Sequence, residues 1–225
     1  MLARLGGGWH EPPIPAPGWE MSPDLEDLKQ RARAVIEQDF GAAAVWGWKD
    51  PRTCLTLPFW QRLLPPMRYV MSMRNPIDVA HSLERRNGFP LEKGVDLWLT
   101  HVQSALAHTA GQQRCVIFYE EVMGNWRHEL RRLAAFLGLP ELSESAEIQA
   151  AAEGFVKDEF QHHRTSIVGA VDEATAGWPF QRRCPTSFFG CMQSRDMANV
   201  GSPGWGKHAD IARLVRPSPG VCQRS

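Results

Sequence analysis

The sequence has no excess of either charge: 25 Lys and Arg residues stand against 25 Asp and Glu residues in a chain of 225. Binding to nucleic acid or to an anionic membrane draws on clustered positive charge, so the composition offers no general basis for either partner. An anionic ligand would have to be held by a local arrangement of side chains. Long hydrophobic runs are also missing, and no segment has the length of a membrane span or of a signal-peptide core.

Cysteine is scarce and scattered. The chain has five cysteines, at Cys54, Cys115, Cys184, Cys191 and Cys222. An odd, dispersed set does not suit a disulfide scaffold and fits a reducing compartment, so we expect a cytoplasmic protein. Cys184 and Cys191 are too far apart for a zinc knuckle and no C-x-x-C pair occurs, so the sequence predicts no metal site.

Apolar residues, by contrast, are present in ordinary amount, and 43% of the chain is enough for one domain with a substantial core. Short apolar runs bounded by turn residues predict strands, and apolar side chains at helical spacing predict helices between them. The predicted strands cover 43–48, 68–73 and 114–119, and the predicted helices cover 22–41, 57–64, 77–86, 95–110 and 125–137. This alternation indicates an α/β fold, a parallel sheet flanked by helices, whose ligands lie beyond the carboxyl ends of the strands.

The two ends of the chain lack such periodicity. Residues 6–23 are rich in Gly, Pro and Trp and are expected to form an irregular lead-in rather than a packed element. From Ala170 onward there is a single leucine, and Gly, Pro, Arg and Ser are plentiful. We therefore expect the α/β domain to cover 1–168. Residues 169–225 are expected to be an irregular, poorly ordered tail. A shifted reading frame would produce a similar composition, so this segment need not be a native ending.

The most informative segment follows the second predicted strand. Arg74 leaves that strand, Asn75 can cap the next helix, and Pro76 can occupy its first position. A helix start presents unpaired N–H groups and a partial positive charge, which favour a phosphate, and Arg74 adds a planar fork of donors. Ser82 can supply a hydroxyl about two turns into the helix. An arginine at a sheet edge and a serine on a solvated helix face explain the same pattern without a ligand.

Two further segments end predicted strands. Lys49 stands at the end of the first one, where an ammonium can meet a transferring anionic group. The alternative for Lys49 is a plain surface turn with an Asp–Arg pair. Tyr119 ends the third strand, where it can pack against a base or ribose, or serve as a core aromatic with a solvated hydroxyl.

In this order, Lys49-Asp50-Pro51-Arg52, Arg74 with Ser82, and Phe118-Tyr119-Glu120 followed by Ala135-Phe136-Leu137-Gly138 resemble the sulfotransferase family. The bacterial and Golgi-type branches are the most similar, and the resemblance covers roughly residues 40–140. It implies a sulfotransferase core of the P-loop nucleotide hydrolase type.

The resemblance also implies a reaction and a co-substrate. The family transfers a sulfuryl group from 3′-phosphoadenosine-5′-phosphosulfate (PAPS) to a hydroxyl or amine, here of a small molecule or glycan. By this similarity, Arg74 and Ser82 hold the 3′-phosphate of PAPS, Lys49 contacts the sulfuryl group and acts in catalysis, and Tyr119 lies near the adenosine. No metal is needed where a lysine and backbone donors neutralise the charge.

One family feature is missing. The family opens with a strand and a Gly-rich Arg-Ser-Gly-Thr-type loop that cradles the 5′-phosphosulfate, and Gly6-Gly7-Gly8 lacks its basic and hydroxyl residues. We therefore expect a core that is incomplete at its N-terminus and inactive or weakly active. A non-catalytic nucleotide-binding or interaction module is the alternative. A nucleotide kinase relative is disfavoured because no G-x-x-x-x-G-K-[ST] sequence occurs.

Overall fold

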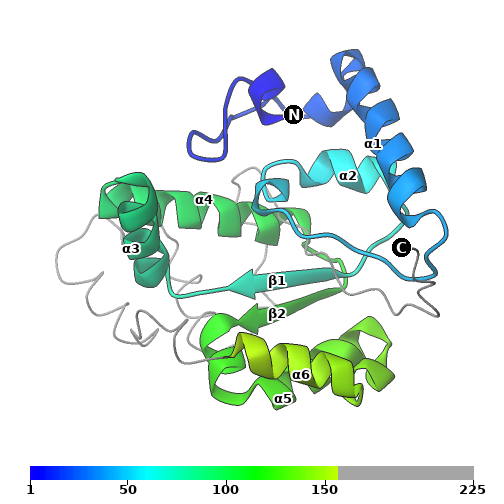
Figure 1. Cartoon of the computed structure of the whole chain (residues 1–225). Helices are drawn as coiled ribbons and strands as arrows, with labels where there is room; N and C mark the ends of the chain where they lie inside the picture. Colours follow the sequence, from blue (N-terminus) through cyan, green and yellow to red (C-terminus); the bar gives the residue numbers. More distant parts are fainter. Residues whose placement is uncertain (157–225) are drawn as a thin grey trace, which may run out of the picture.

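The computed structural model describes residues 1–156, in which helices pack on both faces of a two-stranded parallel sheet (Figure 1). Strands β1 (Tyr69–Met73) and β2 (Arg114–Phe118) pair along their whole length, from Tyr69 opposite Arg114 to Met73 opposite Phe118. Both strands therefore end at the same edge. The predicted α/β fold, with a parallel sheet flanked by helices, is confirmed.

Six α-helices and five short 3-10 turns surround this sheet within residues 1–156. The helices are α1 (Glu26–Phe40), α2 (Leu57–Leu63), α3 (Pro76–Asn87), α4 (Leu91–His108), α5 (Tyr119–Leu137) and α6 (Ala146–Phe155). The 3-10 turns are η1 (Leu2–Leu5), η2 (Trp19–Met21), η3 (Pro23–Leu25), η4 (Pro51–Thr53) and η5 (Pro140–Ser143). All five predicted helices are present, although α4 and α5 begin earlier than the sequence suggested.

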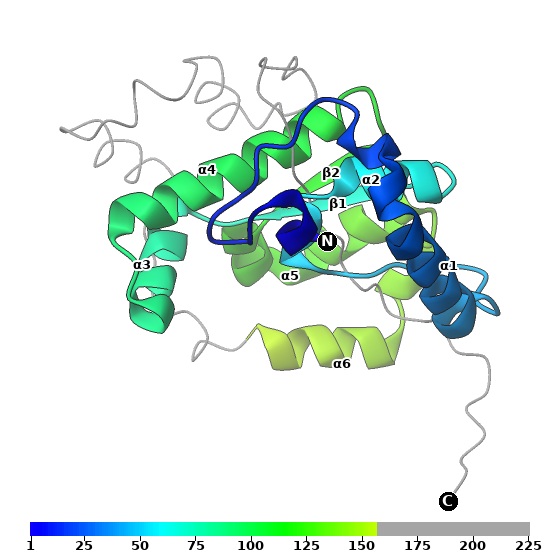
Figure 2. The ribbon, with the colours of Figure 1, turned by 90° about the horizontal axis from the view of Figure 1, so that it is seen from above.

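Alternation of side chains along the strands divides the interior into two layers. Met73 of β1 and Phe118 of β2 face α3 and α4, where they join Ala80, Trp98 and Leu106 in the largest cluster of buried apolar side chains. The opposite face of the sheet is covered by α5, with α6 beyond it (Figure 1). Seen from above, α4 runs over the sheet, and α3 and α1 lie at opposite ends of the molecule (Figure 2).

Helices α3 and α4 approach each other closely at a glycine. A Cβ atom added to Gly94 would lie 2.7 Å from the Cα of Ala80, so only glycine fits there without a shift of one helix. The chain turns between the two helices at Gly88, whose φ of 68° lies in the left-handed region that favours glycine. The close crossing fixes the start of α3 against the sheet.

The prediction of a strand over 43–48 is wrong. Residues 46–50 have no regular structure, and β1 pairs only with β2 among the described residues. Segment 44–48 and the start of β1 line a common cavity of about 440 Å³, and no strand of the described residues pairs with this segment. Its tryptophans stack instead: the ring centroids of Trp46 and Trp48 are 5.2 Å apart, and Phe40 stacks on Trp46 at 4.7 Å.

The N-terminal lead-in is better packed than the sequence suggested. Trp19 is buried and forms a second cluster with Leu25 and Phe59. The large area of the indole ring explains why a segment rich in Gly and Pro still docks. The predicted tail over 169–225, and the predicted end of the domain at 168, lie outside the described residues.

Candidate functional site

The first residues after β1 and β2 meet at the carboxyl edge of the sheet. Arg74 follows β1 directly, and Tyr119 follows β2. The guanidinium carbon of Arg74 lies 4.5 Å from the centre of the Tyr119 ring, the geometry of a cation–π contact. The structure thus brings together two of the four side chains that the sequence singled out.

The turn between β1 and α3 is held by three hydrogen bonds. The indole N–H of Trp98 donates to the carbonyl oxygen of Arg74 over 3.0 Å. The backbone N–H of Asn75 donates to a carboxylate oxygen of Glu120 over 2.8 Å, which ties the two strand ends together. The side chain of Asn75 accepts the N–H of Ile77 over 2.9 Å and caps α3. The backbone that presents Arg74 is therefore fixed from both sides.

Two carboxylates lie at this edge: Asp78, which the sequence did not single out, beside Arg74, and Glu120, which the sequence placed at the end of a strand, beside Asn75. Asp78 is 1% exposed, and its Oδ2 lies 4.0 Å from the Nε of Arg74. The Nε of Arg74, the Oδ1 of Asp78 and the Oε2 of Glu120 are all buried without a hydrogen-bond partner in the described part of the chain. Buried unpaired polar atoms are rare in folded proteins, so three of them at one strand edge mark an unusual place. The sequence held only a weak signal, since an acid in the first turn of a helix is ordinary.

Ser82 lies on the same face of α3 as Asp78. Residues four apart on a helix are neighbours, so Asp78 lies between Arg74 on one side and Ser82 one turn further along. Ser82 is half-buried, and no hydrogen bond joins it to Arg74 within residues 1–156. The joint role of Arg74 and Ser82 at one phosphate stays a prediction.

Lys49 lies in an exposed turn at the start of η4. The adjacent Asp50 accepts the backbone N–H of Arg52 over 2.9 Å and pairs with the guanidinium of Arg52. These bonds to Arg52 hold the pKa of the Asp50 carboxyl below its usual range. Lys49 and Arg74 are both cations, so neither a hydrogen bond nor an ion pair between them is expected, and a shared role of the two side chains at one donor stays a prediction.

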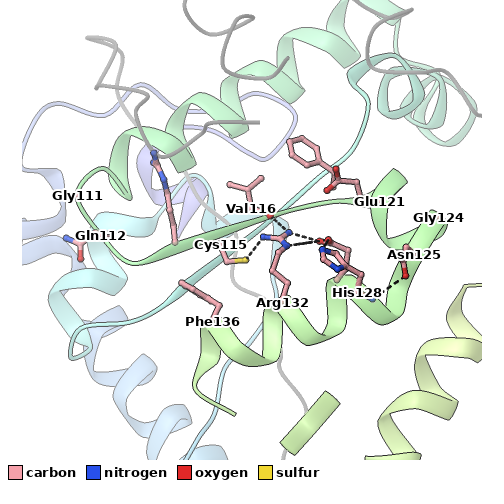
Figure 3. A pocket seen from close by; sticks show the side chains of 13 residues that line it. Gly111, Gln112, Cys115, Val116, Glu121, Gly124, Asn125, His128, Arg132 and Phe136 are labelled. Atoms are coloured by element: carbon pink, nitrogen blue, oxygen red, sulfur yellow. Dashed lines mark hydrogen bonds and ion pairs between the residues drawn. The ribbon is translucent and has the colours of Figure 1, made fainter. Parts of the chain in front are cut away.

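A hollow larger than the cavity near 44–48 lies elsewhere, beside β2 and α5 (Figure 3). It has a volume of about 1010 Å³, and Arg132 of α5 projects into it. The Arg132 guanidinium donates to the carbonyl oxygen of Val116 over 2.6 Å and pairs with the buried Glu129 at 2.5 Å. Burial raises the pKa of the neighbouring Cys115 thiol, which makes it a poor nucleophile.

Neither this hollow nor the 440 Å³ cavity near 44–48 is lined by any of the four predicted site residues. The hydrogen bonds of Arg132 hold α5 against β2, and we read this arrangement as structural. Across residues 1–156, no group of three or more His, Cys, Asp and Glu side chains is arranged to bind a metal ion. No helix in that range is both long and apolar enough to span a bilayer.

Comparison with known proteins gives one result. A family model described as "Sulfotransferase family" matches residues 10–144, more than half of the chain. Comparisons with curated proteins and with solved structures returned no match. The matched range includes both strands and the residues at their carboxyl edge, namely Arg74, Asp78, Tyr119 and Glu120.

Proposed function

The chain belongs to the sulfotransferase family, and on that premise we propose that it transfers a sulfuryl group from PAPS to a hydroxyl or amine of a small-molecule or glycan acceptor. The observation that supports this most is the position of Arg74. Its guanidinium stands at the carboxyl edge of a parallel sheet, at the start of α3 and against the ring of Tyr119. Ligands of open α/β sheets bind at this edge.

The residues around Arg74 suit an adenosine 3′-phosphate. Arg74 offers planar, paired donors that match phosphate oxygens, and the N-terminus of α3 adds partial positive charge. Ser82 is the proposed hydroxyl donor to the same phosphate. Tyr119 has an aromatic ring beside the guanidinium, where an adenine or ribose can pack. The carboxylate of Asp78 opposes an anion, so the positive charge of Arg74 is shared between Asp78 and the ligand.

Lys49 is the proposed catalytic residue. In sulfuryl transfer the bond from sulfur to the bridging oxygen breaks while sulfur bonds to the acceptor atom, and negative charge grows on the bridging oxygen. An ammonium placed there stabilises that charge more in the transition state than in the bound donor, which accelerates the reaction. The exposed position of Lys49 leaves its side chain free to reach a donor.

A non-catalytic nucleotide-binding module is the second candidate. It is favoured by one observation: the sequence has no Gly-rich loop with basic and hydroxyl residues. We propose on this ground that turnover by the chain is weak, since the loop expected to hold the phosphosulfate is missing. Binding of the nucleotide is common to both candidates, and turnover separates them.

The experiment is a calorimetric titration of the chain with adenosine 3′,5′-bisphosphate, followed by an assay for its release from PAPS in the presence of hydroxyl and amine acceptors. Binding together with release supports the enzyme. Binding without release supports the module. The absence of binding contradicts both candidates.

A further inference from the structure

The guanidinium of Arg74 has two edges in different surroundings. A guanidinium is planar and carries five N–H donors, so its Nε edge and its terminal edge can serve two partners at once. The Nε atom is buried, without a hydrogen-bond partner in the described part of the chain, and faces Asp78 at 4.0 Å. The side chain as a whole is 27% exposed, so the guanidinium still has access to solvent.

Two contacts already hold parts of Arg74. The indole of Trp98 binds its backbone carbonyl, and the ring of Tyr119 lies 4.5 Å from its guanidinium carbon. Neither contact occupies the Nε–H. Asp78 makes the one ion pair of Arg74 among the described residues, because it stands one helical turn further along.

The carboxylate of Asp78 is itself incompletely paired. It is 1% exposed and its Oδ1 has no hydrogen-bond partner across residues 1–156, which is costly for a buried charge. The separation of 4.0 Å from Nε exceeds the length of a hydrogen bond. A small shift of the guanidinium toward Oδ2 closes this gap and gives the buried Nε–H of Arg74 the partner that it lacks.

We propose that Asp78 is a positioning residue for Arg74. Its carboxylate accepts the Nε–H of Arg74 and thereby turns the terminal N–H groups toward the ligand's phosphate. This inference rests on the proposed function, since it presupposes that Arg74 binds a 3′-phosphate. Asp78 does not touch the ligand, and its effect on binding passes entirely through Arg74.

The test compares adenosine 3′-monophosphate with adenosine 5′-monophosphate in calorimetric titrations of the full chain. The two ligands differ only in the position of the phosphate, so their affinity ratio isolates the 3′-phosphate contact. The variants are Asp78→Asn, Arg74→Ala and the double variant. Glu84→Gln is the matched control, because it removes one negative charge from the same helix at a side chain that is 49% exposed.

We expect Asp78→Asn to weaken the 3′-monophosphate roughly tenfold, the loss of about one charge-assisted hydrogen bond, and to leave the 5′-monophosphate within about twofold. In the Arg74→Ala background, Asp78→Asn should cause no further weakening. Glu84→Gln should bind both ligands as the unmodified chain does. Asp78→Glu, which keeps the carboxylate, should regain part of the affinity lost in Asp78→Asn.

Three results would overturn the positioning role: equal weakening of both ligands by Asp78→Asn, the same weakening when Arg74 is already alanine, or no weakening at all. If the unmodified chain binds the two ligands equally, the proposed function and the positioning role are both wrong. The first titration shows this before any variant is made, so the two failures can be told apart. Should Asp78→Asn not fold by circular dichroism, Asp78→Ser takes its place in the same comparison. Selective weakening of the 3′-monophosphate by Asp78→Ser, absent when Arg74 is alanine, supports the role, and equal or no weakening contradicts it.

Discussion

At the scale of single residues, the charges around the strand edge have separate tasks. Arg74 is held in place and faces the carboxylate of Asp78, whereas Lys49 is exposed in a turn that Asp50 and Arg52 stabilise. Arg74 is proposed to meet the 3′-phosphate, whose charge does not change during the reaction, so it contributes to binding of the donor and of the transition state alike. Lys49 is proposed to meet the bridging oxygen, where charge develops, so it contributes most to the rate.

This division predicts different kinetic defects for two alanine variants. Arg74→Ala should raise the dissociation constant of adenosine 3′,5′-bisphosphate by roughly ten- to a hundredfold, the value of one charge-assisted interaction. Lys49→Ala should leave that constant within a few fold and lower the turnover rate by about a hundredfold or more. Titration and steady-state kinetics on both variants check the pair. Equal effects of the two substitutions on both quantities are incompatible with the assigned roles.

His101 on α4 predicts a pH dependence of stability. Burial lowers the pKa of His101 and outweighs the hydrogen bond, 2.8 Å long, between its Nδ1 and the carbonyl oxygen of Leu97. As the pH falls below about 6.5, the imidazole therefore takes up a proton in the unfolded chain before it does so in the folded one. The free energy of unfolding decreases over this range, until the pH passes the lower pKa of His101 in the folded state. The free energy of unfolding should fall by at most about 1.4 kcal/mol per pH unit from this group.

The measurement is urea unfolding between pH 7 and pH 5 for the unmodified chain and for His101→Gln. The variant should show a shallower decline over this range, because glutamine does not titrate. Identical slopes for the two proteins would rule out a buried, neutral imidazole at this position.

At the scale of elements, the sequence predicted those parts whose signals are local. β1 and α3 were predicted because an apolar run, a cap at Asn75 and a proline at Pro76 stand in order along a few residues. The segment 43–48 has the same apolar character, yet it forms no strand because a strand also needs a partner, and that depends on the rest of the fold. The burial of Asp78 and of the Oε2 of Glu120 was equally invisible, since it arises from the meeting of elements distant in sequence.

The crossing of α3 and α4 predicts opposite effects for two glycine substitutions. Gly94→Ala places a methyl group 2.7 Å from the Cα of Ala80 and should destabilise the fold by about 1–3 kcal/mol. Gly154→Ala, in α6, meets no atom within 4 Å and should stabilise the fold by up to about 1 kcal/mol, the difference in helix propensity. Thermal unfolding of both variants checks this contrast. A neutral Gly94→Ala would show that the two helices are not in close contact.

The attachment of α5 to β2 predicts that a buried ion pair matters more than an exposed one. Arg132→Met leaves Glu129, whose side chain is 7% exposed, without its partner and should cost about 3 kcal/mol, at the low end for buried pairs because Arg132 is 38% exposed. Arg127→Met breaks a pair with Glu153 in which both side chains are more than half exposed, and should cost less than about 1 kcal/mol. Urea unfolding of the two variants gives the comparison. Losses of similar size would mean that Arg132 does not hold α5.

At the scale of the whole described molecule, two layers of helices enclose a small sheet whose carboxyl edge carries the candidate site (Figure 1). Two paired strands alone are marginal in water, so the position of that edge depends on α3, α4 and α5. The cation at the edge and the helix start beside it are consequences of this packing. The proposed function therefore depends on one property of the molecule: the junction of β1 and α3 binds a phosphate on the ribose 3′ position.

The most direct measurement of that claim is the ratio of the dissociation constants of adenosine 5′-monophosphate and adenosine 3′-monophosphate, in the unmodified chain and in Arg74→Ala. Binding of the 3′-phosphate at this junction predicts that the unmodified chain binds the 3′-monophosphate about tenfold more tightly than the 5′-monophosphate. The ratio should fall to about one in Arg74→Ala. Equal binding of the two nucleotides by the unmodified chain, or a preference that persists without Arg74, would contradict it.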